Sequence, residues 1–452
     1  MSQPAPDGAP PPRAAPDPRD SVRTRGYLVV LLVAAVVGVP VSAAAYGFLA
    51  LVHELQDLVF HDLPRGLGFH GTPVWWPVPA LALSGALVAL TLRYLPGTGG
   101  HEPADGMSTK GVSAVSDLPG IVIAAIASLA LGVVLGPEAP LIALGGGLAL
   151  GAVRLTGRDL PDQATRVITG AGSFAAVSAL LGSPLLGAFL LMEASGLGGT
   201  MLGVVLVPGL LAAGIGALIF TGLGSWTGLG TYSLALHHVP SARTPDAAQF
   251  GWALVIGLGA ALAGAGVRWV ALMIRPHVAR RRLPLSVLAG LAVAGLTVAY
   301  AQGTGHTVSD VLYSGQNSLD PLLEHRAGYT VGALVLLLVC KALAYGVSLS
   351  AFRGGPIFPA MFVGAVGGTA LSHAGGLPVT AGFAMGIGAM CVAMLGLPMT
   401  SVLLATLLLG KPGLTVMPLV IVAVVVSYVL STRLRLRQET ASPPTRQATS
   451  RN

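Results

Sequence analysis

The stretch Gly136-Pro-Glu-Ala-Pro140, followed by an apolar and glycine-rich segment, decides how the rest of this chain is interpreted. It recurs as Gly355-Pro-Ile-Phe-Pro359, again before an apolar helix. A second pair follows in the same order, since Gly182-Ser-Pro-Leu-Leu-Gly187 resembles Gly396-Leu-Pro-Met-Thr400. The two copies of each motif are separated by nearly the same length of chain. Two motifs in one order with nearly equal offsets predict two homologous halves.

The composition places the chain in a membrane. Of its 452 residues, 53% are hydrophobic and only 10% are charged, whereas soluble domains carry roughly 25% charged residues. Its mean hydropathy is +0.77. Apolar stretches at 27–52, 76–95, 203–222, 248–274 and 329–350 approach or exceed the roughly 20 residues that cross a bilayer. The net charge of +7 does not indicate nucleic-acid binding, because the basic residues flank the apolar segments. No metal site or cofactor is predicted.

Charge and segment length predict the topology. Arginines before residue 26 and at 433–437 indicate that both termini are cytoplasmic, in a multi-pass protein of the plasma or inner membrane. Short segments at 138–153, 183–194, 357–372 and 397–410 are typical of broken helices that meet near the midplane. We therefore expect an all-α fold of two inverted repeats, 25–224 and 248–432, joined by an extracytoplasmic linker, 225–247. A disordered tail (1–24) precedes them and a short basic tail (433–452) follows.

The repeated motif also predicts the chemistry of the site. A helix that begins inside the bilayer directs unpaired N–H groups and a positive dipole end at whatever lies before it. Two such N-termini, at Glu138 and Ile357, would form an anion site from backbone amides. Glu138 would be a gate, since its carboxylate can occupy the place of the anion. The simpler interpretation is a glutamate that only stabilises the start of its own helix. The intramembrane position and the second motif favour the gate.

These residues resemble the CLC family of chloride channels and proton/chloride antiporters, over roughly 25–432. Gly136-Pro-Glu-Ala139 is similar to the family's G-[KR]-E-G motif, so the resemblance makes Glu138 the gating glutamate. Gly355-Pro-Ile-Phe358 is similar to G-x-[IF]-F, so Ile357 and Phe358 would supply backbone amide donors. The resemblance also implies inverted halves of tilted and broken helices, in a homodimer with one pathway per subunit.

Three positions depart from the family pattern. Gly99-Gly-His-Glu-Pro103 best matches the motif G-S-G-I-P, so Gly100 replaces a serine ligand, and His101 and Glu102 add polarity near the inner mouth. The inner proton-accepting glutamate would fall on Ala194, one residue after Glu193. The late anion-coordinating tyrosine has no counterpart, since Tyr428 lies well before its expected position.

These features favour passive transport of chloride or a similar small anion, by a channel or uniporter. The alternative is a proton-coupled antiporter for chloride, fluoride or another anion, with protons rerouted through Glu193, Glu102 or His101. Glu193 is equally consistent with a solvated residue at a helix end. For Lys341, within an apolar segment, we expect an ion-pair or interfacial role. An intramembrane enzyme is a distant alternative, because the spans contain no Ser/His/Asp, His/His/Glu or paired-Asp constellation.

Overall fold

A computed structural model describes residues 24–106, 113–155, 157, 162–178, 180–196, 200–325 and 328–441, without the side chains of 200–202 and 436–441. The described chain is helical. Its longer helices are α2 (Arg25–Asp57), α4 (Pro77–Tyr94), α5 (Leu118–Leu129), α6 (Glu138–Leu155), α7 (Asp162–Val177), α8 (Pro184–Ser195), α9 (Thr200–Thr227), α10 (Ala247–Arg280), α11 (Arg282–Thr304), α13 (Val331–Ala351), α14 (Ile357–Leu371), α15 (Val379–Leu395), α16 (Pro398–Leu408) and α17 (Lys411–Ala441). The short elements are η1 (Leu58–Asp62), α3 (Leu63–Gly66), η2 (Pro96–Gly99), η3 (Pro103–Asp105), η4 (Val115–Asp117), η5 (Val308–Asp310), η6 (Gln316–Ser318) and α12 (Leu319–Glu324).

Within the described residues, eight helices are long and apolar enough to cross a membrane. Their outer faces carry exposed apolar side chains; Leu28, Leu32 and Val36 of α2 are 61%, 65% and 63% exposed. Their spacing of four residues puts them on one face of the helix, where lipid replaces water as the surroundings. One expectation needs correction: α6 has 18 residues and is itself one of the eight, whereas the sequence predicts that 138–153 is too short to span.

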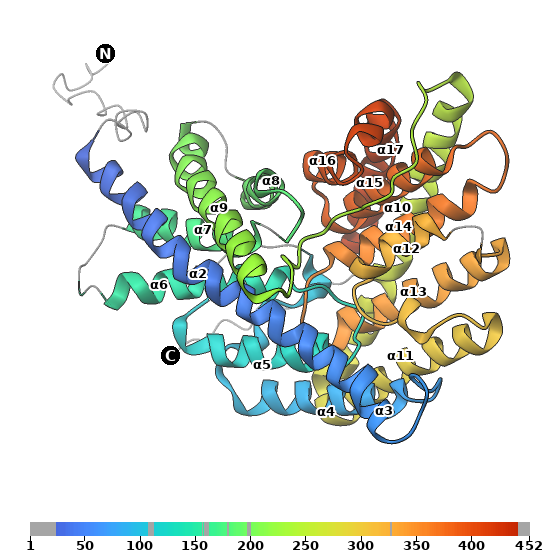
Figure 1. The fold of residues 1–452 in the computed structure, drawn as a ribbon, viewed down its shortest axis with the longest axis horizontal. Helices are drawn as coiled ribbons and strands as arrows, with labels where there is room; N and C mark the ends of the chain where they lie inside the picture. The colour runs from blue at the N-terminus through green and yellow to red at the C-terminus, as the bar shows by residue number, and fades with distance from the viewer. Residues whose placement is uncertain are drawn as a thin grey trace, which may run out of the picture.

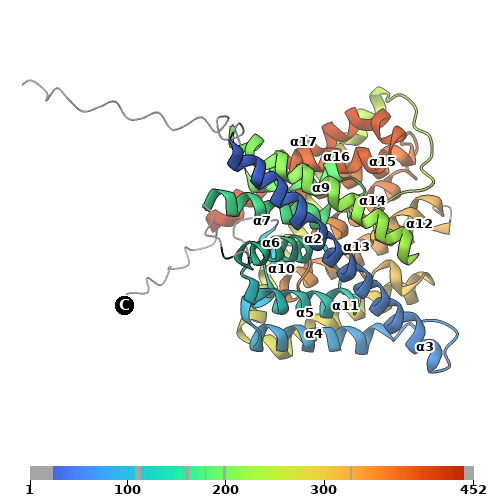
Figure 2. The same ribbon diagram turned by 60° about the vertical axis from the view of Figure 1, so that its left-hand side comes forward.

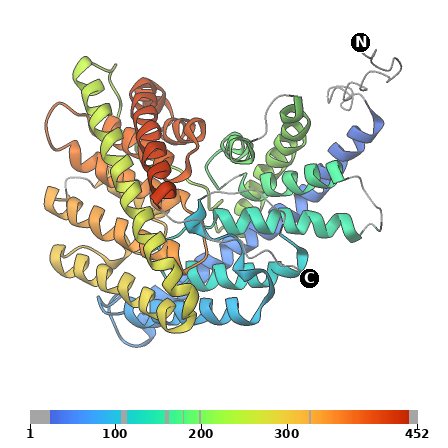
Figure 3. The ribbon, with the colours of Figure 1, turned by 180° about the vertical axis from the view of Figure 1, so that it is seen from behind.

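The helices form two inverted repeats of the same order. The first contains α2 and α4 to α9; the second contains α10, α11 and α13 to α17. The packing repeats as well: α2 contacts α7 and α9, just as α10 contacts α15 and α17. Helix α2 crosses obliquely in front in Figure 1, and α10 crosses the opposite face in Figure 3. These views and the matched contacts fit two halves related by an approximate twofold axis.

Two helices contact their own counterparts across the repeats: α4 packs on α11, and α8 on α16. Helices α4 and α11 lie side by side at the lower edge of Figure 2. Glycines make this crossing close, since a Cβ on Gly85 would lie 2.3 Å from the Ser286 carbonyl oxygen. A Cβ on Gly290 would lie 2.1 Å from that of Leu81. Small residues at such contacts let helix backbones approach, which is the usual basis of helix packing in lipid.

The ends of the repeats lie close to the expected boundaries, with one difference. Thr24 caps α2 by accepting the Tyr27 N–H, α9 ends at Thr227, and α10 begins at Ala247. Helix α17 continues to Ala441, so the expected start of a tail at 433 lies inside a helix. The apolar side chains that predict the last span end before the helix does, because the helical backbone hydrogen bonds of α17 continue through polar residues. Residues 1–23 and 442–452, expected to belong to the tails, lie outside the described residues.

Lys341 is fully buried on α13, and its Nζ donates to the carbonyl oxygens of Asp310, Leu312 and Tyr313 at 3.2, 2.7 and 3.0 Å. The expected ion-pair or interfacial role is therefore wrong. The ammonium group satisfies backbone acceptors of the segment after η5, and its position 4.8 Å from the Phe362 ring centroid adds a cation–π contact. A buried charge is tolerated when hydrogen bonds replace its hydration.

Candidate functional site: two helix N-termini joined by a backbone bridge

The two repeated motifs meet at one point. Gly136 and Gly355 form an isolated antiparallel bridge, in which the Gly136 N–H donates to the Gly355 carbonyl at 2.8 Å and the Gly355 N–H to the Gly136 carbonyl at 2.6 Å. Helix α6 begins two residues after one partner of this bridge, and α14 two residues after the other. The first glycines of the two motif copies are therefore in direct contact with each other. The N-termini of α6 and α14 are therefore held next to each other.

The Glu138 side chain reaches from the start of α6 to the start of α14. It is fully buried, and its Oε1 accepts the N–H of Ile357 at 2.5 Å. Its Oε2 is also buried and has no hydrogen-bond partner among the described residues. The carboxylate therefore takes the position that a bound anion would take at an amide-lined helix end. This is not the simpler expected arrangement, in which the glutamate stabilises only its own helix.

Helix α14 has no side-chain cap of its own. The residue before its first turn is Pro356, which makes no side-chain hydrogen bond to the helix. By contrast, α10 is capped by Asp246 and α13 by Thr330. The first amide of α14 is consequently available to an acceptor from elsewhere, and in this structure the acceptor is Glu138. Phe358, the next residue, is buried in the same first turn, and Ala139 is partly buried in the first turn of α6.

The Glu138 carboxylate can occupy its position only because both bridge residues, Gly136 and Gly355, lack a side chain. A Cβ on Gly355 would lie 2.0 Å from Cδ, 2.2 Å from Oε1 and 2.4 Å from Cγ of Glu138. A Cβ on Gly136 would lie 2.0 Å from Glu138 Oε2 and 2.9 Å from Cδ2 of Phe358. Because all these distances are far below van der Waals contact, any side chain at either glycine would compete with the carboxylate for its space.

Two serines hold the segments that lead to the bridge, and sequence reasoning missed both. Ser348 of α13 accepts the N–H of Val134 at 3.3 Å, and Ser128 of α5 accepts the N–H of Arg353 at 3.1 Å. Helices α5 and α13 are counterparts in the two repeats, so each repeat fixes the approach segment of the other. The only signal in the sequence was that the two serines are separated by nearly the same length of chain as the two motifs.

Tyr345 brings a hydroxyl group to the bridge and was also missed. It is fully buried on α13, and its hydroxyl donates to the carbonyl oxygen of Pro356 at 2.8 Å. Pro356 lies between the bridge residue Gly355 and the first amide donor, Ile357. Tyr428, which the sequence comparison considered, is 38% exposed on α17. No sequence feature distinguishes Tyr345, because its apolar helix has the composition of an ordinary span.

The inner motif forms a compact turn near a buried arginine. A Cβ on Gly99 would meet Leu92 Cδ2 at 2.6 Å and Arg353 Cγ at 3.2 Å, and φ is +69° at Gly99 and +87° at Gly100. Arg353 is only 6% exposed, and its Nε donates to the Thr98 carbonyl at 3.2 Å. Arg353 thus connects this turn to the segment that precedes α14, a link that sequence reasoning did not find.

The two polar residues of this motif have different partners. His101 is exposed, and its Nε2 lies 3.0 Å from the Gly106 carbonyl oxygen. Glu102 lies between two arginines, with Oε2 at 2.6 Å from Arg275 Nη2 and Oε1 at 3.7 Å from Arg353 Nη2. Glu102 therefore compensates the charge of the buried Arg353, and its carriage of protons stays a prediction.

Glu193 lies at the junction of counterpart helices α8 and α16. Its carboxylate accepts the N–H groups of Met399 and Thr400 at 3.0 and 2.7 Å, and the Thr400 hydroxyl at 2.6 Å. A carboxylate at a helix N-terminus is stabilised by these donors and by the helix dipole. Glu193 is thus a cap for the start of α16 rather than a merely solvated residue. Whether it also takes part in proton movement stays a prediction.

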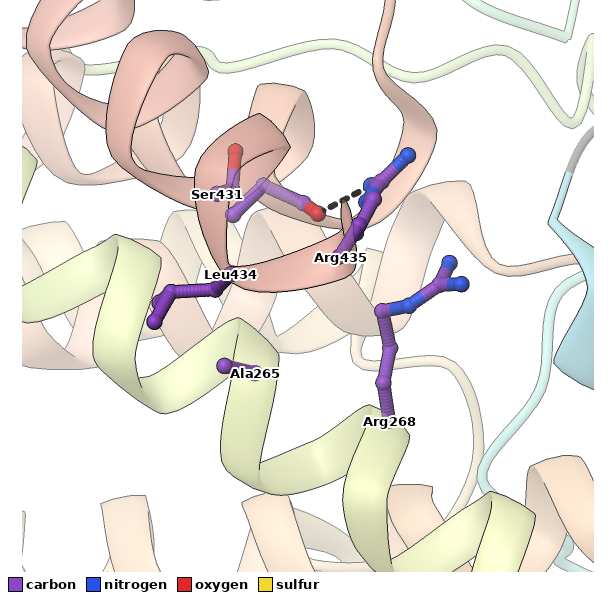
Figure 4. Close-up of a pocket in the computed structure, with 6 residues that line it drawn as sticks. Ala265, Arg268, Ser431, Leu434 and Arg435 are labelled. Carbon is purple, nitrogen blue, oxygen red and sulfur yellow. Dashed lines mark hydrogen bonds between the residues drawn. The ribbon is translucent and has the colours of Figure 1, made fainter. Parts of the chain in front are cut away.

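A further pair of arginines lines a small pocket between α10 and α17. Figure 4 shows Ala265 and Arg268 of α10 across from Ser431, Leu434 and Arg435 of α17. Arg435 Nη2 donates to the carbonyl oxygens of Ala393 at 2.5 Å and Met394 at 3.2 Å, near the C-terminus of α15. A cation is favoured there because the C-terminal end of a helix is negative. We assign Arg435 this packing role.

Comparison with known proteins agrees with this architecture. The family described as "Voltage gated chloride channel" matches residues 85–432. The protein named "Putative ion-transport protein YfeO" from Escherichia coli O139:H28 (strain E24377A / ETEC) is 30% identical over 343 residues, which cover 76% of this chain and 78% of that protein. The protein of the same name from Shigella boydii serotype 4 (strain Sb227) gives the same values.

Two solved structures share the fold. A slow cyanobacterial Cl⁻/H⁺ antiporter superposes with a TM-score of 0.67 at 17% identity, covering 91% of this chain and 98% of that one. A CLC-type fluoride/proton antiporter gives a TM-score of 0.67 at 20% identity, covering 91% and 97%. The inverted repeats and the joined helix N-termini define a polytopic ion-transport protein of CLC architecture. The chain belongs to the voltage gated chloride channel (CLC) family, and its general function is anion transport.

Proposed function

We propose that this protein conducts chloride or a similar small inorganic anion passively, through a pathway gated by Glu138. The observation that carries the proposal is the hydrogen bond from Ile357 N–H to Glu138 Oε1 at a buried pair of helix N-termini. An anion that replaces the carboxylate would find the same donors. Because these are amides and partial dipole charges, they can bind an anion without trapping it. Gly136, Gly355, Ile357, Phe358 and Ala139 would form this central site.

The pathway would continue past the inner motif. Gly99, which is buried, and Gly100, which is partly buried, form a turn that lies against Arg353, and His101 with Glu102 would define the mouth of the pathway. Gly100 stands where the family has a serine whose hydroxyl binds the anion, so this hydroxyl ligand is missing here. The attraction for an anion at the turn of Gly99 and Gly100 would then come from the positive charge of Arg353. Glu102 partly balances that charge at 3.7 Å, which leaves a moderate rather than a strong attraction for anions.

Protonation would control the gate. As the pH falls, a protonated Glu138 loses the charge that favours its place at the α14 N-terminus, so anion flux should rise. Passive conduction is favoured because Ala194 stands where the resembling antiporters have an inner glutamate. The second candidate is proton-coupled antiport of chloride, fluoride or another anion. It is favoured by the two structures of similar fold, which are a Cl⁻/H⁺ antiporter and a fluoride/proton antiporter, and by the carboxylates of Glu193 and Glu102.

The remaining features of the proposal concern assembly and orientation. The family resemblance implies a homodimer with one pathway in each subunit. Arginines cluster where α10 ends and α11 begins, and again near the end of α17. The positive-inside bias then puts both termini on the cytoplasmic side of the plasma membrane.

Flux measurements in reconstituted liposomes test the gate and separate the two candidates. Chloride, fluoride, bromide and nitrate fluxes are followed from pH 4.5 to 7.5 with a pH dye inside the vesicles. Glu138→Gln should raise flux at neutral pH and remove its pH dependence, while Glu54→Gln, an exposed glutamate of α2, should change neither. If wild-type flux does not vary with pH, the gating role is wrong. Uphill proton movement driven by an anion gradient would replace passive conduction with antiport.

A further inference from the structure

A basic pocket opens on the outer surface of the protein where α4 ends and α11 begins. It has a volume of about 510 Å³ and is partly open to the surroundings. Its lining combines three guanidinium groups with apolar side chains and contains no carboxylate: Ala89, Leu90, Leu92, Arg93, Arg281, Arg282, Leu283 and Pro284. The pocket is too large for a single halide ion, and its charge selects an anionic group.

The close crossing of α4 and α11 fixes this pocket. With the helices held together at Gly85 and Gly290, the Nη1 of Arg282 donates to the Leu92 carbonyl at 3.3 Å, at the end of α4. Arg93 lies 5.5 Å from the ring centroid of its neighbour Tyr94. Arg93 thus lies in the last turn of α4 and Arg282 at the first residue of α11, so two of the guanidinium groups extend from helix ends.

The three arginines differ from their neighbour Arg275 in what they bind. Arg275 forms ion pairs with Glu102 and Asp105, each at 2.6 Å. Of the carboxylates that the structure describes, none lies within salt-bridge distance of Arg93, Arg281 or Arg282. Three like charges around one pocket repel each other, so a bound anion would stabilise the arrangement. Arginine pairs bidentately with phosphate, which makes phosphate the best-matched anionic group.

An apolar surface leads away from the pocket along α4. Leu83, Leu87 and Leu90 are 51%, 39% and 40% exposed, and their spacing of four and three residues puts them on one face. Leu288 of α11, 57% exposed, lies on the helix that packs against it. A ligand with a phosphate at one end and hydrocarbon at the other fits both features. Basic pockets at helix ends on one face of a membrane are the expected sites for such lipids.

We propose that this pocket binds the phosphate headgroup of an anionic phospholipid, whose acyl chains lie along the exposed leucines of α4. The guanidinium groups of Arg93, Arg281 and Arg282 surround the phosphate, and Leu90 with Leu283 contacts the glycerol and upper chain region. The site is separate from the anion pathway, and its existence does not depend on whether that pathway is passive or coupled. Leu92 lies between the two, since it lines the pocket and its Cδ2 lies next to Gly99.

The test is lipid binding by the full-length protein in a neutral detergent. Short-chain phosphatidylglycerol, short-chain phosphatidylcholine and inorganic phosphate are titrated, with thermal stability as the readout. The variant Arg93→Gln/Arg281→Gln keeps the bond from Arg282 to Leu92. The matched control, Arg25→Gln/Arg154→Gln, removes the same charge from exposed arginines outside the pocket. Chloride flux in phosphatidylcholine vesicles verifies that both variants are folded.

We expect phosphatidylglycerol to stabilise the wild type and the control, and to bind about 30-fold more weakly to the pocket variant. Inorganic phosphate and phosphatidylcholine should have little effect. Equal weakening in the control and pocket variants would overturn the proposal, since the attraction would then be diffuse. Stabilisation by inorganic phosphate but not by phosphatidylglycerol would also overturn it, because the occupant would be a free anion. If the pocket variant does not fold, Arg281→Gln alone against Arg280→Gln alone makes the same comparison.

Discussion

Replacing Gly355 with alanine should release Glu138 from the start of α14. The three atoms nearest to the new Cβ would be Cδ, Oε1 and Cγ of Glu138, at 2.0 to 2.4 Å. Gly355 is not among the glycines with positive φ, so alanine suits the backbone, and the bridge to Gly136 uses only backbone atoms. The glutamate side chain is the flexible partner and should move. It would lose a charge-assisted hydrogen bond to Ile357, worth about 1.5–3 kcal/mol.

That loss corresponds to a shift of about 10- to 150-fold in the ratio of docked to undocked carboxylate. Anion flux at pH 7.5 should therefore rise toward the value of Glu138→Ala, and its pH dependence should flatten. The assay is chloride efflux from liposomes, normalised to the amount of reconstituted protein. The four-way comparison of wild type, Gly355→Ala, Glu138→Ala and the double variant isolates the contact between the two positions.

In the Glu138→Ala background, the colliding atoms are absent, so Gly355→Ala should have little further effect. Gly367→Ala is the matched control, because its Cβ on α14 would lie 3.8 Å from Leu338, an ordinary contact. If Gly355→Ala lowers flux equally in both backgrounds, the glycine serves only backbone packing. The reasoning about the docked carboxylate would then be refuted.

Two other substitutions test the supporting residues. Glu193→Gln removes the charge at the start of α16, so the local stability at this helix end should fall by about 0.3–1 kcal/mol. The amide hydrogens of Met399 and Thr400 should exchange correspondingly faster. A loss of proton-coupled flux without this local change would instead make Glu193 a proton carrier. Tyr345→Phe leaves the Pro356 carbonyl with only the longer bond from the Ala360 N–H, so the free energy of unfolding should fall by about 0.5–1.5 kcal/mol. The chloride concentration for half-maximal flux should also shift, and unchanged denaturation and chloride dependence would contradict a role for the hydroxyl.

The sequence by itself determined the class of the protein and indicated Glu138 as the residue for which we propose a gating role. Apolar length places helices in the bilayer, and this depends only on local composition. The repeated Gly-Pro-x-x-Pro motif indicated the two halves, and it singled out Glu138 and Ile357 before any contact was known. These features are readable because each is contained in a few consecutive residues. Errors arose at boundaries, as in α17, where hydrogen bonding continues past the apolar pattern.

Only the tertiary structure decided which residues share the site. The bond from Glu138 to Ile357, the cap of Glu193 on α16 and the contact of Arg353 with the inner turn all join segments that are far apart in the sequence. Lys341 illustrates the same limit, since its partners are backbone carbonyls that carry no sequence signature. Sequence patterns report the environment of one segment at a time. The partners of a buried polar group depend on how the two inverted repeats pack together, and on which of their backbone donors and acceptors that packing leaves available.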